Sequence, residues 1–303
     1  MNIVFEENKL EFDEISHPGF EQKKIKLSIA RLDKIHPVVS GNKLFKLHYF
    51  LEEAVNSSHK KIITFGGAYS NHLLATAYAA NNLGLHAIGI VRGEKPRDES
   101  RTLELCRESG MQLHYISRAS YKNIQEPAFL NNLKKEFGER VIIPEGGFSH
   151  LGAKGASLIM ERLQLNQPTH ICVAVGTATT LAGLLQGSEK GETIIGFPVL
   201  KNMTDIGSRL TFLNIDKYPG KLNILDEYHF GGYAKTTPEL ISFMNDFYTD
   251  HKVPLDFIYT AKMMYGTMEK IDQHYFREGS NIICLHTGGL QGNISLEKGT
   301  LVY

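Results

Sequence analysis

Two lysines, Lys43 and Lys46, stand three positions apart in the segment SGNKLFKLHYF (residues 40–50), where the apolar spacing predicts the start of a helix. The N-terminal end of a helix carries positive potential, which disfavours a cation. A lysine that must react as a neutral amine gains from the same position, because positive potential lowers its pKa. The segment alone fits either an ordinary surface lysine or a lysine that carries a covalent cofactor.

The segment ITFGGAYSNHLLATA (residues 63–77) joins a predicted buried strand to a predicted helix. Gly66 and Gly67 permit a tight turn, and Ser70 or Asn71 can cap the helix. The free N–H groups at the start of the helix would suit a small anion such as a substrate carboxylate. Capping is the commoner use of these residues, so this stretch by itself favours a structural role.

A second strand–helix turn, in ICVAVGTATTLAGLL (residues 171–185), is rich in hydroxyl groups. Successive backbone N–H groups and hydroxyls make a cradle for a phosphate dianion. The turn matches neither G-x-x-x-x-G-K-[ST] nor G-x-G-x-x-G, so a nucleoside triphosphate or a dinucleotide is not its first interpretation. An ordinary turn with capping threonines fits equally well. The residues concerned are Gly176, Thr177, Ala178, Thr179 and Thr180.

A third turn, in NIICLHTGGLQGN (residues 281–293), places Thr287 directly after a strand and before two glycines. Glycine lets a backbone approach a ligand closely, although a plain structural turn explains the pattern as well. No histidine or cysteine spacing supports a zinc site, and no G-x-S-x-G element supports an acyl-transfer serine. We therefore expect no metal.

Buried strands and helical segments alternate along most of the chain, which predicts a doubly wound α/β architecture. The strands lack strict polar alternation, as in parallel sheets covered on both faces. One helix is predicted over residues 70–84, with Gly84 at its C-terminal cap. Ligands of such sheets bind beyond the carboxyl ends of the strands, where all three turns lie. The predicted strands are residues 61–65, 86–91, 112–117, 141–144, 171–176, 193–199 and 281–289.

The composition excludes several classes of partner. Acidic and basic residues balance at 33 each among 303 residues, so no net field favours nucleic acid or an anionic membrane. No apolar run approaches the roughly 20 residues that span a bilayer, and the acidic N-terminus does not resemble a signal peptide. Three widely spaced cysteines argue against a disulfide framework. We expect a cytoplasmic protein.

The segments SGNKLFKL, GGAYSNHLLATA, VGTATTLAGL, IYTAKMMYG and LHTGG occur in the order found in a known family. Together they resemble the pyridoxal-phosphate enzymes grouped as 1-aminocyclopropane-1-carboxylate (ACC) deaminase and D-cysteine desulfhydrase. The resemblance runs from about Ser40 to Gly289. It implies the tryptophan synthase β-like fold, called fold type II, with the cofactor between two α/β domains, and commonly a homodimer. The implied division is residues 43–150 for the smaller domain and 1–42 with 151–303 for the larger, cofactor-binding one.

Carried over by position, the resemblance implies that Lys43 forms the covalent bond to pyridoxal 5'-phosphate. Lys46 could be the neighbouring cation that lowers its pKa, or simply a packed or solvent-facing side chain. The turn from Gly176 to Thr180 matches the phosphate cup, with Ala178 where a glycine is often found, which leaves only a positive-φ backbone in question.

Further positions follow from the same resemblance. Asn71 matches the residue that approaches the 3-oxygen of the cofactor ring. Ser70 matches the residue that holds the substrate carboxylate or relays a proton, and His72 after it follows the desulfhydrase pattern. We therefore predict that Ser70, Asn71 and His72 contact the substrate. Tyr233 and Tyr259 match two active-site tyrosines, although either could be an ordinary core residue.

Thr260 and Thr287 discriminate between the two activities. In the deaminases a glutamate replaces the first and pairs with the pyridinium nitrogen, and a leucine replaces the second. A hydroxyl stabilises a protonated ring nitrogen less than a carboxylate does, which suffices for Cα deprotonation and loss of a good leaving group.

The resemblance thus predicts α,β-elimination from a small amino acid, with D-cysteine giving pyruvate, sulfide and ammonia. The alternatives are cyclopropane deamination, elimination or racemisation on another amino acid, a nucleotide-binding α/β protein such as a dehydrogenase, and a non-catalytic cofactor-binding relic. The physiological substrate and its stereochemistry are not encoded in any single motif.

Overall fold

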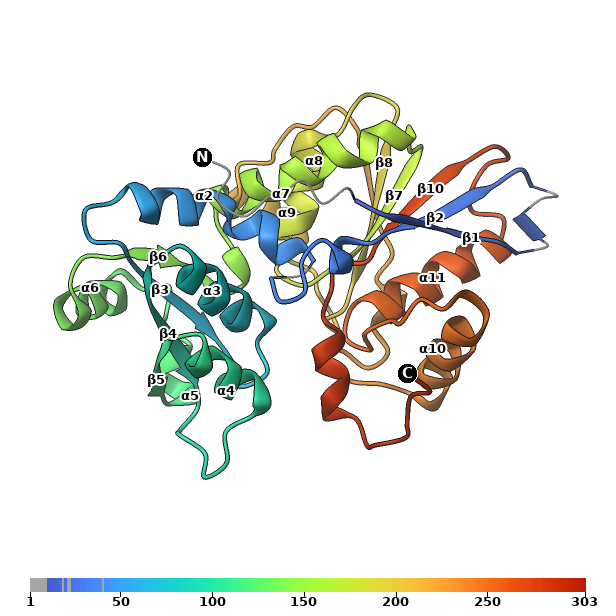
Figure 1. Cartoon of the computed structure of the whole chain (residues 1–303). Coiled ribbons are helices and arrows are strands. Elements are labelled where there is room, and N and C mark those ends of the chain that lie inside the picture. The colour runs from blue at the N-terminus through green and yellow to red at the C-terminus, as the bar shows by residue number, and fades with distance from the viewer. Residues whose placement is uncertain (1–9, 18, 21–22, 40) are drawn as a thin grey trace.

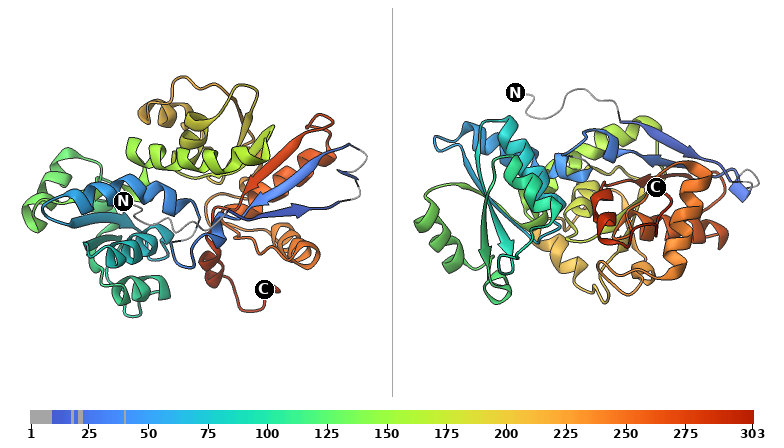
Figure 2. Two further views of the ribbon diagram at one scale, coloured as in Figure 1. Left: turned by 45° about the horizontal axis from the view of Figure 1, so that its top comes forward. Right: turned by 60° about the horizontal axis from the view of Figure 1, so that its bottom comes forward.

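The structure is a computed structural model that describes residues 10–17, 19–20, 23–39 and 41–303. Ser40, where the family resemblance begins, and residues 1–9 of the predicted larger domain lie outside this range. The described strands form two separate sheets, which lie on opposite sides of the molecule in Figure 1 and stay apart in both views of Figure 2.

The smaller sheet has the strand order β5–β4–β3–β6, and its described pairings are all parallel. The larger sheet has the order β1–β2–β10–β7–β8–β9, in which only the pairing of β1 with β2 is antiparallel among the described residues. The strands of the smaller sheet are β3 (Lys61–Gly66), β4 (His86–Arg92), β5 (Gln112–Ile116) and β6 (Val141–Ile143). Those of the larger sheet are β1 (Phe12–Ile15), β2 (Lys26–Ala30), β7 (His170–Val175), β8 (Thr193–Pro198), β9 (Lys221–Ile224) and β10 (Asn281–Leu285).

Each sheet is covered by helices on both faces. The α-helices are α2 (Asn42–Asn56), α3 (Asn71–Asn82), α4 (Arg101–Glu108), α5 (Arg118–Tyr121), α6 (Pro127–Phe137), α7 (His150–Leu163), α8 (Thr179–Gly187), α9 (Ile206–Phe212), α10 (Pro238–His251) and α11 (Thr260–Asp272). Short 3-10 turns are η1 (Leu32–Lys34), η2 (Glu145–Gly147), η3 (Gln164–Asn166), η4 (Glu227–His229) and η5 (Leu290–Ser295).

Strand β7 shows how the larger sheet builds two cores. Ile171, Val173 and Val175 pack with α7 and α8, whereas Cys172 and Ala174 pack with α10 and α11 on the other face. Successive side chains of a strand point to opposite faces, so an uninterrupted apolar run serves both layers. In Figure 1, α10 and α11 accordingly lie below the larger sheet, while α7 and α8 lie above it.

Helix α2 connects the two halves, since it packs against α7 of the larger half and α3 and β6 of the smaller one. It begins where Gly41 adopts φ +71°, and a Cβ there would lie 1.9 Å from the carbonyl oxygen of Thr287. Glycine is therefore needed both for the backbone angle and for the close approach. The contact holds the start of α2 against the turn that follows β10.

The predicted α/β class is confirmed, and each of the seven predicted strands is present to within a few residues. Strands β1, β2 and β9 were not predicted, because they are short edge-side elements of mixed burial that lack a long apolar run. The helix predicted over 70–84 spans Asn71–Asn82, with Gly84 just beyond it at φ +64°. The two sheets lie within the two predicted domains, whose boundaries stay a prediction. No helix in the described part of the chain is long and apolar enough to cross a membrane.

Candidate active site

A cavity lies where the start of α2 meets the carboxyl ends of β7 and β10. Ligand sites of open α/β sheets occupy this edge. Its lining consists of Asn42, Lys43, Lys46, Asn71, Gly146, Ala174, Val175, the turn Gly176–Thr180, Leu181, Tyr259, Thr287 and Gly288. The structure thus brings together most of the residues singled out from sequence, from five separate segments. Ser70, His72, Tyr233 and Thr260 do not line the cavity.

Lys43 is the second residue of α2, and its side chain lines the cavity. Burial lowers the pKa of its amine to about 8, and the negative charge of Asp256 opposes this shift. Its Nζ donates a hydrogen bond to Oδ1 of Asn42 at 2.6 Å. With this pKa about a tenth of the amine is neutral at pH 7, far more than for an ordinary lysine, and the neutral form is the nucleophile.

Asn42 was not assigned a role from sequence, although it stands in the G-N-K element. It is buried, and its Nδ2 donates to Oγ1 of Thr180 at 2.8 Å while its Oδ1 accepts from Lys43. The side chain therefore fixes the reactive amine relative to the turn before α8. Only the tertiary contact between α2 and α8 reveals this function.

Lys46 lies one turn further along α2, is 5% exposed and also faces the cavity. Burial first, and the charge of Lys43 second, hold its pKa well below its usual value. The sequence left two roles open for Lys46, the cation that lowers the pKa of Lys43 and a packed side chain. Burial is what lowers the pKa of Lys43, and Lys46 is itself buried. No ion pair of Lys46 occurs among the described residues, so a bound anion would supply the missing counter-charge.

The turn Gly176–Thr180 presents the N-terminus of α8 to the cavity. Ala178 is its N-cap residue and adopts φ +67°, the left-handed conformation that costs a residue with a Cβ about 1–2 kcal/mol. Oγ1 of Thr177 and Oγ1 of Thr179 lie 2.9 Å apart. A Cβ on Gly176 would lie 3.3 Å from the ring of Tyr259, so glycine keeps this wall open. The free N–H groups and hydroxyls form an anion cradle.

Helix α3 presents Asn71 to the cavity from the opposite half. Its Oδ1 is buried and has no hydrogen-bond partner within the described residues, which is costly unless a ligand supplies one. Ser70 is the N-cap of α3, since its Oγ accepts from the N–H of Leu73 at 3.2 Å. The capping role predicted for Ser70 is therefore present. The hydroxyl proton takes no part in this cap, so it could still be donated to a substrate.

His72 points into the smaller half rather than into the cavity. Its Nε2 lies 2.9 Å from Oγ1 of Thr64, and this hydroxyl donates to the carbonyl of Ile143. Burial lowers the pKa of His72 to about 3, with the charges of Lys43 and Lys46 adding to the effect. The side chain is thus a neutral core histidine in this structure, and its predicted contact with substrate gains no support.

Tyr259 and Tyr233 form an edge-to-face pair with ring centroids 6.1 Å apart. Tyr259 lines the cavity, and burial raises its pKa well above the usual value, so its hydroxyl stays protonated. Tyr233 is 50% exposed and covers the outer side of this pair.

Thr260 is fully buried at the start of α11, directly behind Tyr259. Its Oγ1 donates to Oδ2 of Asp256 at 2.6 Å, and Oγ1 also accepts from the N–H of Asp256 at 2.8 Å. The sequence analysis did not single out Asp256. Its position four residues before Thr260, ahead of a helix, is a capping signal that could have revealed it.

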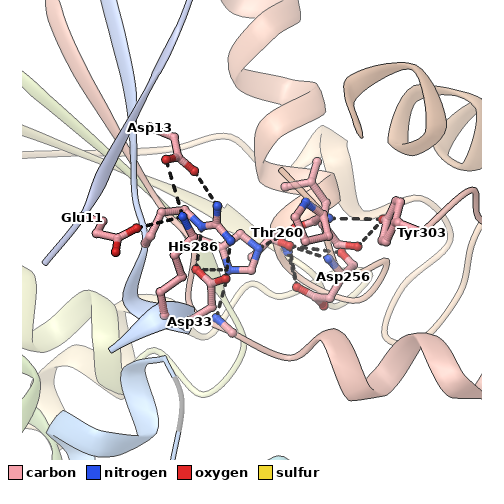
Figure 3. A network of polar contacts seen from close by, with 12 residues as sticks. Glu11, Asp13, Asp33, Asp256, Thr260, His286 and Tyr303 are labelled. Atoms are coloured by element: carbon pink, nitrogen blue, oxygen red, sulfur yellow. Dashed lines mark hydrogen bonds and ion pairs between the residues drawn. The ribbon is translucent and has the colours of Figure 1, made fainter. Parts of the chain in front are cut away.

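A chain of polar contacts connects the segments that carry Thr260 and Thr287 (Figure 3). Arg31 bonds to Asp13 and Asp33, and Oδ1 of Asp33 lies 3.1 Å from Nδ1 of His286. Nε2 of His286 lies 2.8 Å from the carbonyl oxygen of Pro254. The chain ties η1 and β10 to the segment before α11, so the residues on either side, Thr287 and Asp256, are held in fixed positions.

These features fit pyridoxal phosphate. The cavity holds a partly neutral lysine, an anion cradle beside a buried cation, and an orphaned amide oxygen on the facing wall. Lys43 would hold the aldehyde carbon, the Gly176–Thr180 turn with Lys46 would hold the phosphate, and Asn71 would face a polar ring substituent. Within the described residues, no group of histidine, cysteine, aspartate or glutamate could hold a metal ion.

A family model described as pyridoxal-phosphate dependent enzyme matches residues 16–288, and the chain belongs to this family. It is a pyridoxal-phosphate-dependent lyase of the ACC deaminase and D-cysteine desulfhydrase group.

Three proteins similar to this chain carry the names of this group. A putative ACC deaminase of Thermotoga maritima is 31% identical over 90% of this chain and 91% of its own length. A mitochondrial bifunctional D-cysteine desulfhydrase/ACC deaminase of Arabidopsis thaliana is 33% identical over 88% of this chain and 73% of its own length. A crystal structure of an ACC deaminase homologue superposes with a TM-score of 0.80 at 25% identity and covers 97% of this chain and 92% of its own. The predicted family, fold type and cofactor are thereby confirmed.

Proposed function

We propose that the protein catalyses α,β-elimination from D-cysteine. The Cα proton is removed, the Cβ–S bond breaks, and sulfide leaves with the bonding electrons. One water then hydrolyses the remaining three-carbon unit to pyruvate and ammonia. Pyridoxal phosphate, when bound, supplies the electron sink for the negative charge at Cα.

The observation that carries this proposal is the pair of threonines at positions 260 and 287. Both match the desulfhydrase pattern, whereas the deaminase pattern has a glutamate and a leucine. Thr287 lines the cavity, and the bond from Thr260 to Asp256 orients the hydroxyl of Thr260. Loss of thiolate from Cβ demands less of the ring than opening a cyclopropane does.

The chain's own residues bind, orient and move protons in this proposal. Lys43, released when substrate binds, is the Cα base, since its amine is partly neutral near pH 8. Ser70, at the start of α3, donates a hydrogen bond from its hydroxyl to the substrate carboxylate. Tyr259 donates from its protonated hydroxyl, and Tyr233 covers the cavity mouth and excludes water.

The second candidate is deamination of ACC to 2-oxobutyrate and ammonia. The name of the Thermotoga relative favours it, whereas the Arabidopsis relative is named for both activities. The two threonines argue against it. An assay decides between the candidates: the holoenzyme is incubated separately with D-cysteine and with ACC, and sulfide, pyruvate, 2-oxobutyrate and ammonia are measured.

We expect sulfide and pyruvate in equal amounts from D-cysteine, and no 2-oxobutyrate from ACC. Lys43→Ala should abolish both the products and the absorption band of the covalently bound cofactor. Formation of 2-oxobutyrate as the faster reaction would establish the second candidate. A cofactor band with neither set of products would refute both and leave a relic or a different amino-acid substrate.

We also propose a cytoplasmic homodimer of two-domain subunits. The family resemblance supports the dimer. The location is supported by three cysteines that are buried and form no disulfide, as expected in a reducing compartment: Cys106, Cys172 and Cys284. Light scattering after gel filtration tests the dimer, and cell fractionation tests the location.

A further inference from the structure

Lys262 of α11 is a fully buried lysine that the proposed mechanism does not use. Its Nζ donates to the carbonyl oxygen of His229 at 2.9 Å and to that of Gly232 at 2.7 Å. Burial lowers the pKa of its amine to about 8, and the charge of Asp256 opposes this shift. The amine keeps the two N–H donors that the carbonyls need whether it is charged or neutral. These backbone acceptors compensate its burial.

The two carbonyls belong to a tightly folded segment, residues 229–235, here called the Tyr233 segment. The carbonyl of His229 also accepts from the N–H of Gly232 at 3.0 Å, and the carbonyl of Gly232 also accepts from the N–H of Lys235 at 3.1 Å. These bonds close two consecutive turns. Lys262 bonds to the closing carbonyl of each turn, so one side chain fixes the path of the whole segment.

The backbone of the Tyr233 segment is strained. Phe230 and Ala234 adopt φ +49° and +53°, a left-handed conformation that is unfavourable for residues with a Cβ. Gly231 and Gly232 lie between them at φ +86° and +115°. Such a backbone persists only where the surrounding structure imposes it. The contacts that impose it must therefore come from elements packed against the segment.

One face of α11 supplies these contacts. Lys262, Tyr265 and Glu269 follow one another at spacings of three and four residues, which places them on the same side of the helix. The ring of Tyr265 packs edge-to-face on Phe230, with centroids 5.0 Å apart. The hydroxyl of Tyr228, just before the segment, donates to Oε2 of Glu269 at 2.5 Å. Of the three residues of α11, Lys262 is the one that bonds to the backbone of the turns.

The Tyr233 segment brings its tyrosine against the cavity wall. The ring of Tyr233 packs on Tyr259, which lines the cavity, and it leaves half of its own surface exposed. Gly232, whose carbonyl accepts from Lys262, directly precedes Tyr233. A displacement of this carbonyl therefore moves Tyr233 as well. Lys262 is linked to the cavity through Tyr233, although it is not among the residues that line it.

We propose that Lys262 is a positioning residue: by holding the carbonyls of His229 and Gly232 it keeps the Tyr233 segment in its strained conformation, so that Tyr233 packs on Tyr259 and shields the cofactor cavity from water. The inference rests on the proposed function in one respect, the covering role of Tyr233. It does not depend on which amino acid is the substrate.

The test measures how easily a small solute reaches the cofactor in the substrate-free holoenzyme, as quenching of cofactor fluorescence by acrylamide. The variants are Lys262→Met, Tyr233→Ala and the double variant. Methionine is an unbranched side chain that fills the space of lysine but donates no hydrogen bond. Lys23→Met is the matched control, because Nζ of Lys23 donates to the carbonyl oxygen of Ile271 at 2.8 Å, at the other end of α11.

We expect Lys262→Met and Tyr233→Ala each to raise the quenching constant about twofold or more, since solvent then enters the cavity. The double variant should match Tyr233→Ala, because Lys262 acts through Tyr233, and Lys23→Met should keep the wild-type value. With D-cysteine, Lys262→Met should lower kcat/KM about tenfold, but less than about twofold when Tyr233 is already alanine. A purely structural lysine predicts a lower melting temperature with unchanged quenching. That result would overturn the inference, as would additive effects in the double variant.

The possible failures can be told apart. If the wild type produces no sulfide from D-cysteine, the substrate assignment fails, and the quenching comparison still judges Lys262 because it needs no substrate. If Tyr233→Ala leaves the quenching unchanged, the covering role is wrong and the inference falls with it.

A second variant decides the question if Lys262→Met does not fold. Gly232→Ala disturbs the same carbonyl from the side of the segment. A Cβ there would lie 3.4 Å from Cβ of Lys201, an ordinary contact, so the change strains only the backbone at φ +115°. Increased quenching in Gly232→Ala would support the inference, and wild-type quenching would refute it.

Discussion

Ser70→Ala separates the two roles that Ser70 can have, as the cap of α3 and as a substrate contact. The cap is visible as the 3.2 Å bond from the N–H of Leu73 to Oγ, and its loss should cost about 1 kcal/mol of the free energy of unfolding. A lost hydrogen bond to a charged substrate carboxylate should cost about 1.5–3 kcal/mol more in kcat/KM, roughly a 10- to 150-fold decrease.

Two matched variants make this experiment specific. Ser117→Ala removes the same kind of cap from α5, where Oγ of Ser117 accepts from the N–H of Ser120 at 3.1 Å. Neither Ser117 nor Ser120 lines the cavity. Ser117→Ala should lower stability by a similar amount and leave kcat/KM for D-cysteine within twofold of the wild type. Ser70→Asp keeps a capping acceptor, and aspartate is favourable at a helix N-terminus, but its charge repels a carboxylate.

The assays are urea unfolding of each variant and steady-state production of sulfide. We expect Ser70→Asp to be as stable as the wild type and less active than Ser70→Ala. If Ser70→Ala loses stability yet keeps kcat/KM within threefold, the substrate contact is wrong and Ser70 is a cap only.

Three further outcomes follow from the cavity. Lys46→Met should raise the stability of the apo-protein, since it removes a buried cation, yet weaken cofactor binding at least tenfold in a fluorescence titration; a gain in both would contradict the phosphate role. Ala178→Gly relieves the strain at φ +67° but gives the unfolded chain more freedom. Its free energy of unfolding in urea should therefore differ from the wild type by less than about 1 kcal/mol, and it should keep its cofactor affinity. Ala178→Val is strained at this φ, so it should lose both stability and cofactor affinity. Burial lowers the pKa of Lys43 from 10.5 to about 8, so between these values the unfolded state binds the proton and the folded state does not; apo-protein stability should therefore rise from pH 8 to pH 10, and rise less in Lys43→Met.

The sequence predicted the strands of the parallel sheets well because both faces of such strands are buried, which leaves uninterrupted apolar runs. It did not predict β1, β2 or β9, whose alternating or partly exposed residues resemble loop segments. The motifs GNKLFK, GGAYSN and VGTATT identified the family and cofactor through their resemblance to a known family, since each motif taken alone also fits an ordinary helix start or a capped strand–helix turn.

Other parts of the site depend on contacts between segments far apart in the chain. Asn42 bonds to Thr180, 138 residues away, and no local pattern encodes that pairing. His72 stood in a promising motif, but the fold turns it toward Thr64 in the core. The sequence treated Thr260 as an isolated hydroxyl, whereas the helix start brings Asp256 onto it.

The sequence by itself therefore determined the class of fold and the cofactor, and it predicted the lysine that would bind this cofactor. The tertiary structure decided the electrostatics: that burial lowers the pKa of both lysines, that the buried Oδ1 of Asn71 is left for a ligand, and that the carboxylate of Asp256 accepts from Thr260. The physical reason is that residue type and spacing are local, whereas burial and charge interactions depend on every segment that packs around a group.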